Sequence, residues 1–146
     1  MDGAKINTTP LSTSTTLVLK DNSPPADATE YRRVIGSLQY LSLTSPDISY
    51  AVNKISQFMH SLSQIHWATT KKLLRYLKHT LHHGLFLHRQ SPLILHGLFD
   101  SDWVGNRDDR TSTTTFVLYL GKNPISWCSK KQHTVARSST EAEYRL

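Results

Sequence analysis

The chain has 146 residues, enough for one ordinary domain or parts of two, and its 38% hydrophobic and 19% charged residues suit a globular protein. It has no apolar run of about 18 residues and no signal-peptide core, so neither a transmembrane helix nor secretion is predicted. Its formal net charge of +6 favours polyanionic partners, of which nucleic acid is the commonest, although basicity alone does not establish binding.

Residues 1–30 are predicted to form an extended lead-in. They are rich in Thr, Ser, Pro and Asp and have little hydrophobic periodicity. One short strand is expected within them, at Leu17–Leu19.

Residues 31–84 are predicted to be helical. Asp27 and Glu30 suit the amino terminus of a first helix. Ser45 before Pro46 predicts the start of a second helix, with the serine hydroxyl as cap and the proline as first helical residue. The second helix should present one apolar face, made of Ile48, Val52, Ile55 and Met59.

A third helix is expected from Gln64 to His82 and should stop near Gly84, which can adopt the left-handed cap conformation. At 100° per residue, one face of this helix is apolar and an adjoining stripe is basic. The apolar face consists of Trp67, Leu73, Leu74, Leu77 and Leu81. The basic stripe consists of Lys71, Arg75, Lys78 and His82.

Two interpretations of the basic stripe remain open. A cationic stripe beside an apolar face can lie along a phosphate backbone while its helix packs on its own domain, so Lys71, Arg75 and Lys78 are candidate nucleic-acid-binding residues. The same pattern also describes the solvated side of an ordinary surface helix.

The histidines near the end of this helix are expected to be solvated rather than metal ligands. His79, His82, His83 and His88 have no nearby carboxylate or cysteine to complete a metal site. Cys128 is the single cysteine, which excludes disulfides and thiolate metal cages within one chain and fits a reducing intracellular compartment.

Residues 85–146 change to a strand-rich pattern with a helix start at the end. Strands are expected at Leu85–Leu87, Leu93–Phe99, Thr113–Leu120 and Ile125–Ser129, the last two joined by a turn at Gly121–Pro124. The sequence Ser138-Ser-Thr-Glu141 has capping-box spacing and predicts the start of a helix.

Two acidic residues in this part have the placement that metal-dependent hydrolysis uses. Asp100 lies where an apolar strand ends, and Glu141 lies in the first turn of the last predicted helix. Carboxylates gathered from such positions can hold two Mg²⁺ ions that clamp a phosphodiester. Helix capping alone also explains Glu141. Spacing does not separate these two residues from the other eligible acids, Asp102, Asp108, Asp109 and Glu143.

A series of motifs resolves this ambiguity through a resemblance. Tyr31-Arg-Arg-Val-Ile-Gly-Ser-Leu-Gln-Tyr-Leu41 and Ser45-Pro-Asp-Ile-Ser-Tyr-Ala-Val52 are followed by His66-Trp67 and Leu73-Leu-Arg-Tyr-Leu-Lys-His-Thr80. In this order they resemble the region after the polymerase palm in copia-type reverse transcriptases. The later motifs resemble the ribonuclease H domain of the same family: Asp100-Ser-Asp-Trp-Val-Gly105, Asp108-Asp-Arg-Thr-Ser112, Ile125-Ser-Trp-Cys-Ser-Lys-Lys-Gln132 and Ser138-Ser-Thr-Glu-Ala-Glu-Tyr144.

The resemblance implies an α+β chain from a retrotransposon Pol polyprotein. Residues 31–84 would be a helical thumb or connection segment that contacts the template–primer duplex. Residues 85–146 would be a truncated ribonuclease H-like domain, with a three-strand antiparallel meander and the start of the first helix. The implied activity is Mg²⁺-dependent cleavage of RNA in RNA–DNA hybrids. Asp100 matches the first catalytic aspartate and Glu141 the catalytic glutamate, both of which would be metal ligands, while Asp102 would support them without binding metal.

Some positions depart from the family pattern. Ser45 stands where arginine is common, and Ser101 and Val104 stand where alanine is usual. The family's later catalytic aspartates lie beyond the first helix, and no polymerase Tyr-x-Asp-Asp motif occurs here.

The leading expectation is therefore a polyprotein fragment that is inactive as it stands, such as a decayed copy. Two alternatives are an active nuclease whose missing acids come from another chain or an extension, and a non-catalytic basic module that binds nucleic acid.

Overall fold

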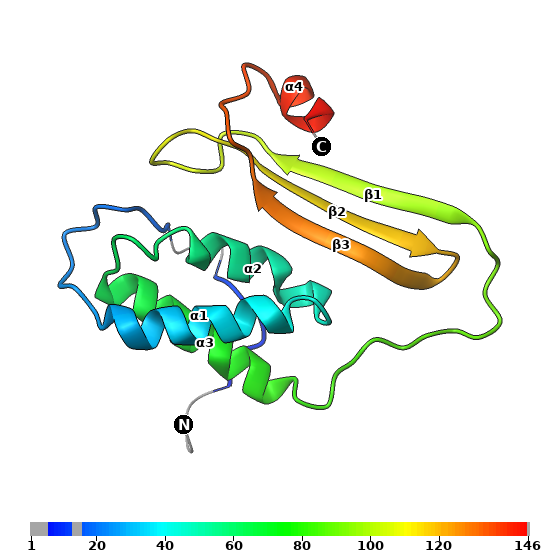
Figure 1. The fold of residues 1–146 in the computed structure, drawn as a ribbon, viewed down its shortest axis with the longest axis horizontal. Helices are drawn as coiled ribbons and strands as arrows, with labels where there is room; N and C mark the ends of the chain where they lie inside the picture. Colours follow the sequence, from blue (N-terminus) through cyan, green and yellow to red (C-terminus); the bar gives the residue numbers. More distant parts are fainter. Residues whose placement is uncertain (1–5, 13–15, 146) are drawn as a thin grey trace. The chain divides into compact units, whose positions relative to one another are not determined.

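The computed structural model describes residues 6–12 and 16–145, in which three helices precede a three-stranded antiparallel sheet and a short fourth helix (Figure 1). This element order confirms the α+β class. The chain divides into two compact units, Met1–Gly84 and Leu85–Leu146. The first unit contains the three helices, and the second contains the sheet and the last helix.

Helix α1 (Ala28–Leu41) begins at the cap that the sequence predicts. The Asp27 carboxylate accepts hydrogen bonds from the backbone N–H groups of Thr29 at 2.8 Å and Glu30 at 3.2 Å. These bonds satisfy two of the donors that a first helical turn leaves unpaired. The buried side of α1 consists of Tyr31, Ile35 and Leu38.

Helix α2 (Pro46–Ser56) begins with its proline, as predicted. Ser45 occupies the cap position, but its side chain makes no cap hydrogen bond, so the prediction that its hydroxyl caps the helix is wrong. Its ψ is 88°, whereas two serines that do cap helices, Ser63 and Ser138, have ψ of 169° and 164°. The predicted apolar face is buried at Ile48, Val52 and Ile55, and Met59 lies past the helix end, partly buried.

Helix α3 (Gln64–His79) ends three residues before the predicted end at His82. Thr80 is its C-cap, and the Thr80 N–H bonds the carbonyls of Tyr76 and Leu77, at 3.0 and 3.2 Å. Gly84 does not have positive φ, so the predicted left-handed glycine cap is wrong.

The three helices enclose one apolar core. Its buried helical members come from every helix, with Phe58 from the connection between α2 and α3: Tyr31, Ile35, Leu38, Ile48, Ala51, Val52, Ile55, Phe58, Leu73 and Tyr76. Two phenol hydroxyls join helices across this core. Tyr31 donates to the Ile55 carbonyl at 2.6 Å, and Tyr76 donates to the Asp47 carboxylate at 2.7 Å. Burial raises the pKa of Tyr31 to about 12, and the hydrogen bond to Asp47 raises that of Tyr76 to about 12.

The lead-in contributes to this core, but it does not form the strand predicted at Leu17–Leu19. That prediction is wrong. The residues there have no regular structure, because Leu17 inserts among the helices with only 5% exposure. The only bridge recorded outside the named strands of the described ranges pairs Pro25 with Ser63. Residues 1–5 and 13–15 of the predicted lead-in lie outside the described residues.

The sheet has strand order β1 (Leu95–Asp102), β2 (Thr113–Leu120) and β3 (Asn123–Lys131), all antiparallel. The bounds of β2 are those predicted. The first strand begins later than expected and continues to Asp102, because β1 pairs along the full length of β2. The structure has no strand at Leu85–Leu87, so that prediction is wrong.

A two-residue turn joins β2 to β3. Gly121 has φ of +60° and its N–H donates to the Ile94 carbonyl at 2.7 Å. A positive φ at this position is typical of the tight turns whose twist matches that of hairpin strands. Glycine adopts this conformation without the steric penalty that a side chain would bring.

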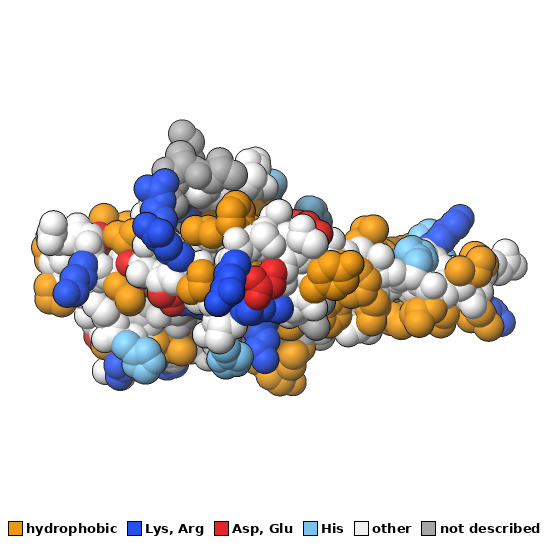
Figure 2. Space-filling model, turned by 90° about the horizontal axis from the view of Figure 1, so that it is seen from above, with side chains coloured by type: hydrophobic (Ala, Val, Ile, Leu, Met, Phe, Trp, Pro, Cys, Tyr) orange, Lys and Arg blue, Asp and Glu red, His pale blue; other side chains and the backbone are white. Residues whose placement is uncertain are grey.

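Much of the apolar surface of the sheet remains exposed. Leu95 and Leu98 are 65% and 64% exposed, and Phe99 is 55% exposed. Figure 2 shows apolar side chains at the surface where the strands lie. Among the described residues, no helix is long and apolar enough to cross a bilayer.

Replacing Tyr31 with phenylalanine tests the buried hydrogen bond that joins α1 to α2. We expect Tyr31→Phe to lower the free energy of unfolding by about 1–2 kcal/mol, because the Ile55 carbonyl loses its phenol donor inside the core. Urea titration followed by circular dichroism measures this loss. Tyr40→Phe removes the same hydroxyl from a side chain that is 79% exposed and should leave the midpoint unchanged. Equal effects of the two substitutions would contradict the assignment.

Candidate functional site

The basic stripe lies on α3, opposite the buried side of the helix. Lys71 and Lys78 are exposed, Arg75 is half-buried, and Leu73 and Tyr76 between them are buried. At 100° and 1.5 Å per residue, these three cations fall within an arc of about 60° and span about 10 Å. Helix α3 ends before His82 and Leu81, so His82 leaves the stripe and Leu81, at 72% exposure, leaves the apolar face.

Local contacts orient the stripe. The Lys71 ammonium lies over the Trp67 ring, 5.2 Å from its centroid, and the Arg75 Nε donates to the Lys71 carbonyl at 3.3 Å. Trp67 is itself partly buried against the core, so Lys71 is supported by an anchored ring. Lys78 lies in the last turn, where a cation also interacts favourably with the helix dipole. The geometry is therefore compatible with both interpretations of the stripe.

Asp100 lies inside β1, two residues before its end, and is exposed. It pairs with Thr115 of β2, which in turn pairs with Ser129 of β3. Its carboxylate accepts the N–H of Ser101 at 2.8 Å. Because side chains alternate along a strand, Asp100 points to the opposite side of the sheet from Ser101 and its partner Thr114.

Glu141 lies in the first turn of helix α4 (Ser139–Tyr144). Its N–H donates to the Ser138 hydroxyl at 3.1 Å, which confirms the predicted cap. Its carboxylate does not complete the capping box on Ser138, because it accepts the N–H of Arg137 at 2.6 Å and pairs with the Arg145 guanidinium. The Arg137 N–H and the Arg145 side chain hold the pKa of Glu141 below its usual value.

Asp100 and Glu141 make separate polar contacts in the structure. In residues 6–12 and 16–145, no three His, Cys, Asp or Glu side chains gather closely enough to hold a metal ion. Gln132 ties α4 to the Thr114 side of the sheet, since its amide donates to Thr114 Oγ1 at 2.9 Å and to the Ala142 carbonyl at 2.7 Å. Among the described residues, the two carboxylates therefore belong to no set of three side chains that could hold Mg²⁺.

The other acidic residues after β1 stabilise their own loop. The Asp102 carboxylate lies so close to Gly105 that a Cβ there would overlap it. Asp109 accepts from Thr111 and from the Lys131 ammonium, the latter at 2.5 Å. Although burial raises the pKa of Asp109, these hydrogen bonds outweigh it and lower the pKa.

Val104 has φ of +58°, which is strained for a β-branched residue.

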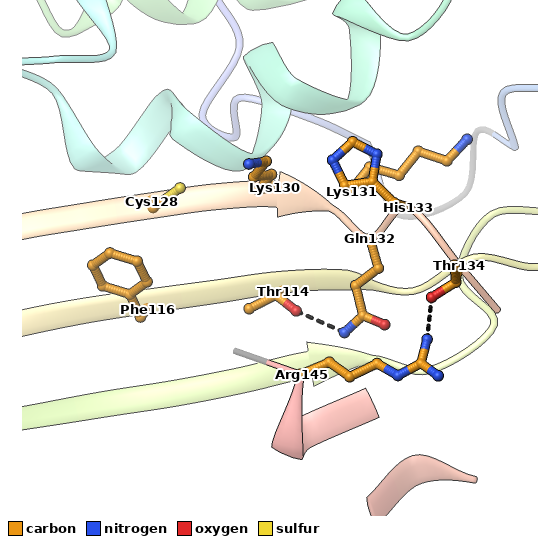
Figure 3. Close-up of a pocket in the computed structure, with 9 residues that line it drawn as sticks. All are labelled: Thr114, Phe116, Cys128, Lys130, Lys131, Gln132, His133, Thr134 and Arg145. Carbon is orange, nitrogen blue, oxygen red and sulfur yellow. Dashed lines mark hydrogen bonds between the residues drawn. The ribbon is translucent and has the colours of Figure 1, made fainter. Parts of the chain in front are cut away.

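A pocket of about 360 Å³ lies on the Thr114 side of the sheet, beneath α4. Phe116 and Cys128 give it apolar walls, and Gln132 and Arg145 reach across it toward Thr114 and Thr134 (Figure 3). Arg145 also pairs with Glu141, so this cation is shared between the pocket and the candidate acid.

Sequence reasoning missed a polar cluster at the start of α3. Asp21, Ser63 and His66 are connected by hydrogen bonds, although Asp21 is 42 residues from Ser63. Part of the signal was visible, because Ser63 and His66 have the three-residue spacing of a capping box. The sequence pattern did not indicate that His66 takes the place of the usual Glu or Gln in the capping box.

The chain is similar in sequence to several known proteins. The chain is 53% identical, over 97% of its length, to the retrovirus-related Pol polyprotein from transposon RE2 of Arabidopsis thaliana. It is 54% identical over the same share to that from transposon RE1 of the same plant. It spans about a tenth of the length of each of these polyproteins. It is also 42% identical over 78% of its length to the secreted RxLR effector protein 161 of Plasmopara viticola, of which it covers 81%. No family model and no solved structure matches the chain.

The pKa of Glu141 offers a test of its surroundings. We expect Arg145→Gln to raise this pKa toward the usual value, because the guanidinium that stabilises the carboxylate is lost. The rise should be partial, since the Arg137 N–H remains. Arg137→Gln keeps that backbone donor and should change the pKa less. Carboxyl carbon NMR shifts followed against pH measure both, and an equal or larger rise in Arg137→Gln would contradict the assignment.

Proposed function

Because the chain belongs to the copia-type family of retrotransposon Pol polyproteins, we propose that it joins the end of the reverse transcriptase to the start of ribonuclease H. Residues 31–84, the helical segment of the first unit, are proposed as the thumb or connection segment. The second unit, residues 85–146, is proposed as the opening part of the ribonuclease H-like domain. In the polyprotein, the proposed substrate is an RNA–DNA hybrid.

The proposed task of the helical unit is to hold a nucleic-acid duplex by its phosphates. The proposal rests mainly on the basic stripe of Lys71, Arg75 and Lys78 on the outer side of α3. Its length of about 10 Å corresponds to about three steps of 3.4 Å along one strand of a duplex. Three cations at this spacing support contact with successive phosphates and provide no means of reading base sequence.

A second proposal concerns the sheet unit, which would supply Asp100 and Glu141 to the ribonuclease H site of the polyprotein. It is favoured by the antiparallel β1–β2–β3 meander followed by α4, which packs against β1, the strand that carries Asp100. Carboxylates of this kind are the ligands that Mg²⁺ prefers. Since the described residues gather no set of three such ligands, completing the site would depend on the rest of the polyprotein.

The salt dependence of binding tests the basic stripe. We expect the triple variant Lys71→Gln, Arg75→Gln, Lys78→Gln to bind duplex DNA more weakly, with a log–log salt slope flatter by up to about 2.7. The reason is that each phosphate neutralised on duplex DNA contributes about 0.9 to the slope through counterion release. Fluorescence anisotropy with a labelled duplex, from about 50 to 200 mM salt, measures the slope.

A matched control for the stripe variant removes the same charge elsewhere in the helical unit. Lys20→Gln, Arg32→Gln, Arg33→Gln changes three exposed cations outside α3 and should leave most of the slope intact. If the stripe variant keeps the full slope, or if the control flattens it equally, the stripe is only a solvated helix face.

Hybrid cleavage by the Pol polyprotein tests the acidic residues. With this chain in its polyprotein context, Asp100→Asn and Glu141→Gln should each lower cleavage of a labelled RNA–DNA hybrid at least about a hundredfold, as expected for residues that stabilise the transition state. Asp108→Asn and Glu143→Gln are matched controls and should retain activity. Full activity of Asp100→Asn, with the same protein still binding duplex, would remove the nuclease proposal and leave the binding proposal intact.

A further inference from the structure

The pocket beneath α4 has an apolar end and a cationic end. Phe116 and Cys128 are partners across β2 and β3, and Thr114 and Lys130 form the next pair on the same side of the sheet. The two pairs are two residues apart along their strands, which separates them by about 7 Å. The pocket volume of about 360 Å³ lies within the range of about 300–1,000 Å³ that holds small molecules. The pocket can therefore receive a flat apolar group and a charged group of the same ligand.

The charges around the pocket favour an anion. Among the described residues no Asp or Glu lines it, whereas Lys130, Lys131 and Arg145 do. The Lys131 ammonium pairs with Asp109 at 2.5 Å, which offsets part of its charge. The Arg145 guanidinium pairs with Glu141 in the same way. Lys130 is exposed, and among the described residues no hydrogen bond or ion pair holds its side chain. An anionic group would therefore bind at Lys130.

The aromatic wall favours a flat partner. Phe116 and Cys128 extend from neighbouring strands at the same end of the pocket (Figure 3). The ring centroid of Phe116 lies 6.2 Å from that of Phe99, its partner on β1, and Phe99 is 55% exposed. Nucleobases stack on aromatic side chains whatever their sequence, because every base has a π-face. Two neighbouring aromatic rings on one side of a sheet can receive two successive bases.

We propose that this pocket binds a nucleotide, with its base stacked on Phe116 and its phosphate bound by the Lys130 ammonium. The chemistry that the pocket recognises is a flat aromatic base joined to a phosphate. A free mononucleotide and one nucleotide of a single strand both supply it. A duplex does not fit, because its bases are paired and stacked on one another and cannot enter a pocket without leaving the stack.

The nucleotide pocket is separate from the two sites proposed above. Asp100 points to the opposite side of the sheet from Thr114, because side chains alternate along β1 and β2. The basic stripe lies on α3, in the other unit of the chain. Loss of duplex binding by the stripe, or of hybrid cleavage through Asp100, would therefore leave this proposal intact.

The thiol of Cys128 reports directly on the pocket. Cys128 is the single cysteine of the chain, is partly buried and lines the apolar end, so a bound base would cover it. The measurement is the rate at which N-ethylmaleimide, an uncharged reagent, labels the full chain in the background of the stripe variant. With ligand at about ten times its Kd, labelling should slow about tenfold, because the unbound fraction falls to about a tenth.

Three probes separate the sources of the nucleotide: adenosine monophosphate, a single-stranded oligoadenylate and a duplex of the same length. Protection by adenosine monophosphate assigns the pocket to a single nucleotide. Protection by the oligoadenylate alone assigns it to a strand that also contacts Phe99. Two results would overturn the proposal. One is the absence of protection by either of these probes up to millimolar concentration, and the other is equal protection by the duplex.

Substitutions test the two ends of the pocket separately. Phe116→Leu keeps an apolar side chain but removes the ring, so binding should weaken at least about fivefold. Lys130→Gln changes an exposed side chain without disturbing the sheet, and it should flatten the log–log salt slope for the single strand by about 0.7, the share of one phosphate.

Matched controls remove a ring and a charge outside the pocket. Phe86→Leu changes a ring that is 76% exposed before the sheet, and Lys122→Gln changes an exposed cation at the turn between β2 and β3. Both should keep the affinity and the salt slope of the unsubstituted pocket. Unchanged binding in Phe116→Leu and Lys130→Gln, or equal losses in the two controls, would show that no nucleotide occupies the pocket.

Discussion

The burial of one side of α3 against α1 and α2 decides what the helical unit presents to its surroundings. Leu73 and Tyr76 are buried, and the Tyr76 hydroxyl is held by Asp47 at the start of α2. Rotating α3 about its axis would break these contacts and expose apolar surface, at about 25 cal/mol for each Å². With that side fixed, the helical repeat directs the basic stripe outward. The outward charge is thus a consequence of the packing.

The sheet unit differs from the helical unit in the residues that it buries. Its well-buried residues are mostly small or polar, and they lie near the loop after β1 and around α4: Asn106, Thr111, Ser112, Thr113, Ala136 and Ala142. Large apolar residues of β1 remain exposed. Backbone pairing along two strand ladders joins the strands of this unit, whereas the helical unit has a buried apolar core. The two units should respond differently to conditions that weaken hydrophobic burial.

Signals contained within a few residues could be predicted from the sequence. The Asp27 cap, the proline at the start of α2 and the bounds of β2 depend on short-range geometry. Leu17 could not be placed, because its neighbours come from helices far along the chain. The Ser45 hydroxyl makes no cap bond although serine and the following proline have the usual pattern, and no pattern of residue types reveals this. For the candidate site, exposure of the basic stripe followed from helical spacing, but the end of α3 at His79, before His82, did not.

Contacts formed only in the three-dimensional fold also explain why the surroundings of Asp100 and Glu141 could not be predicted. Spacing describes Glu141 as a helix cap and resemblance describes it as a metal ligand, while in the fold its carboxylate binds the Arg137 N–H and the Arg145 side chain. An ion pair between partly exposed residues one helical turn apart contributes little, so a stronger cation could displace Arg145. The orientation of Asp100 is the greater obstacle. Strand alternation turns it away from the side of the sheet to which Gln132 ties α4. Replacing the partners of Glu141 would therefore leave the orientation of Asp100 unchanged.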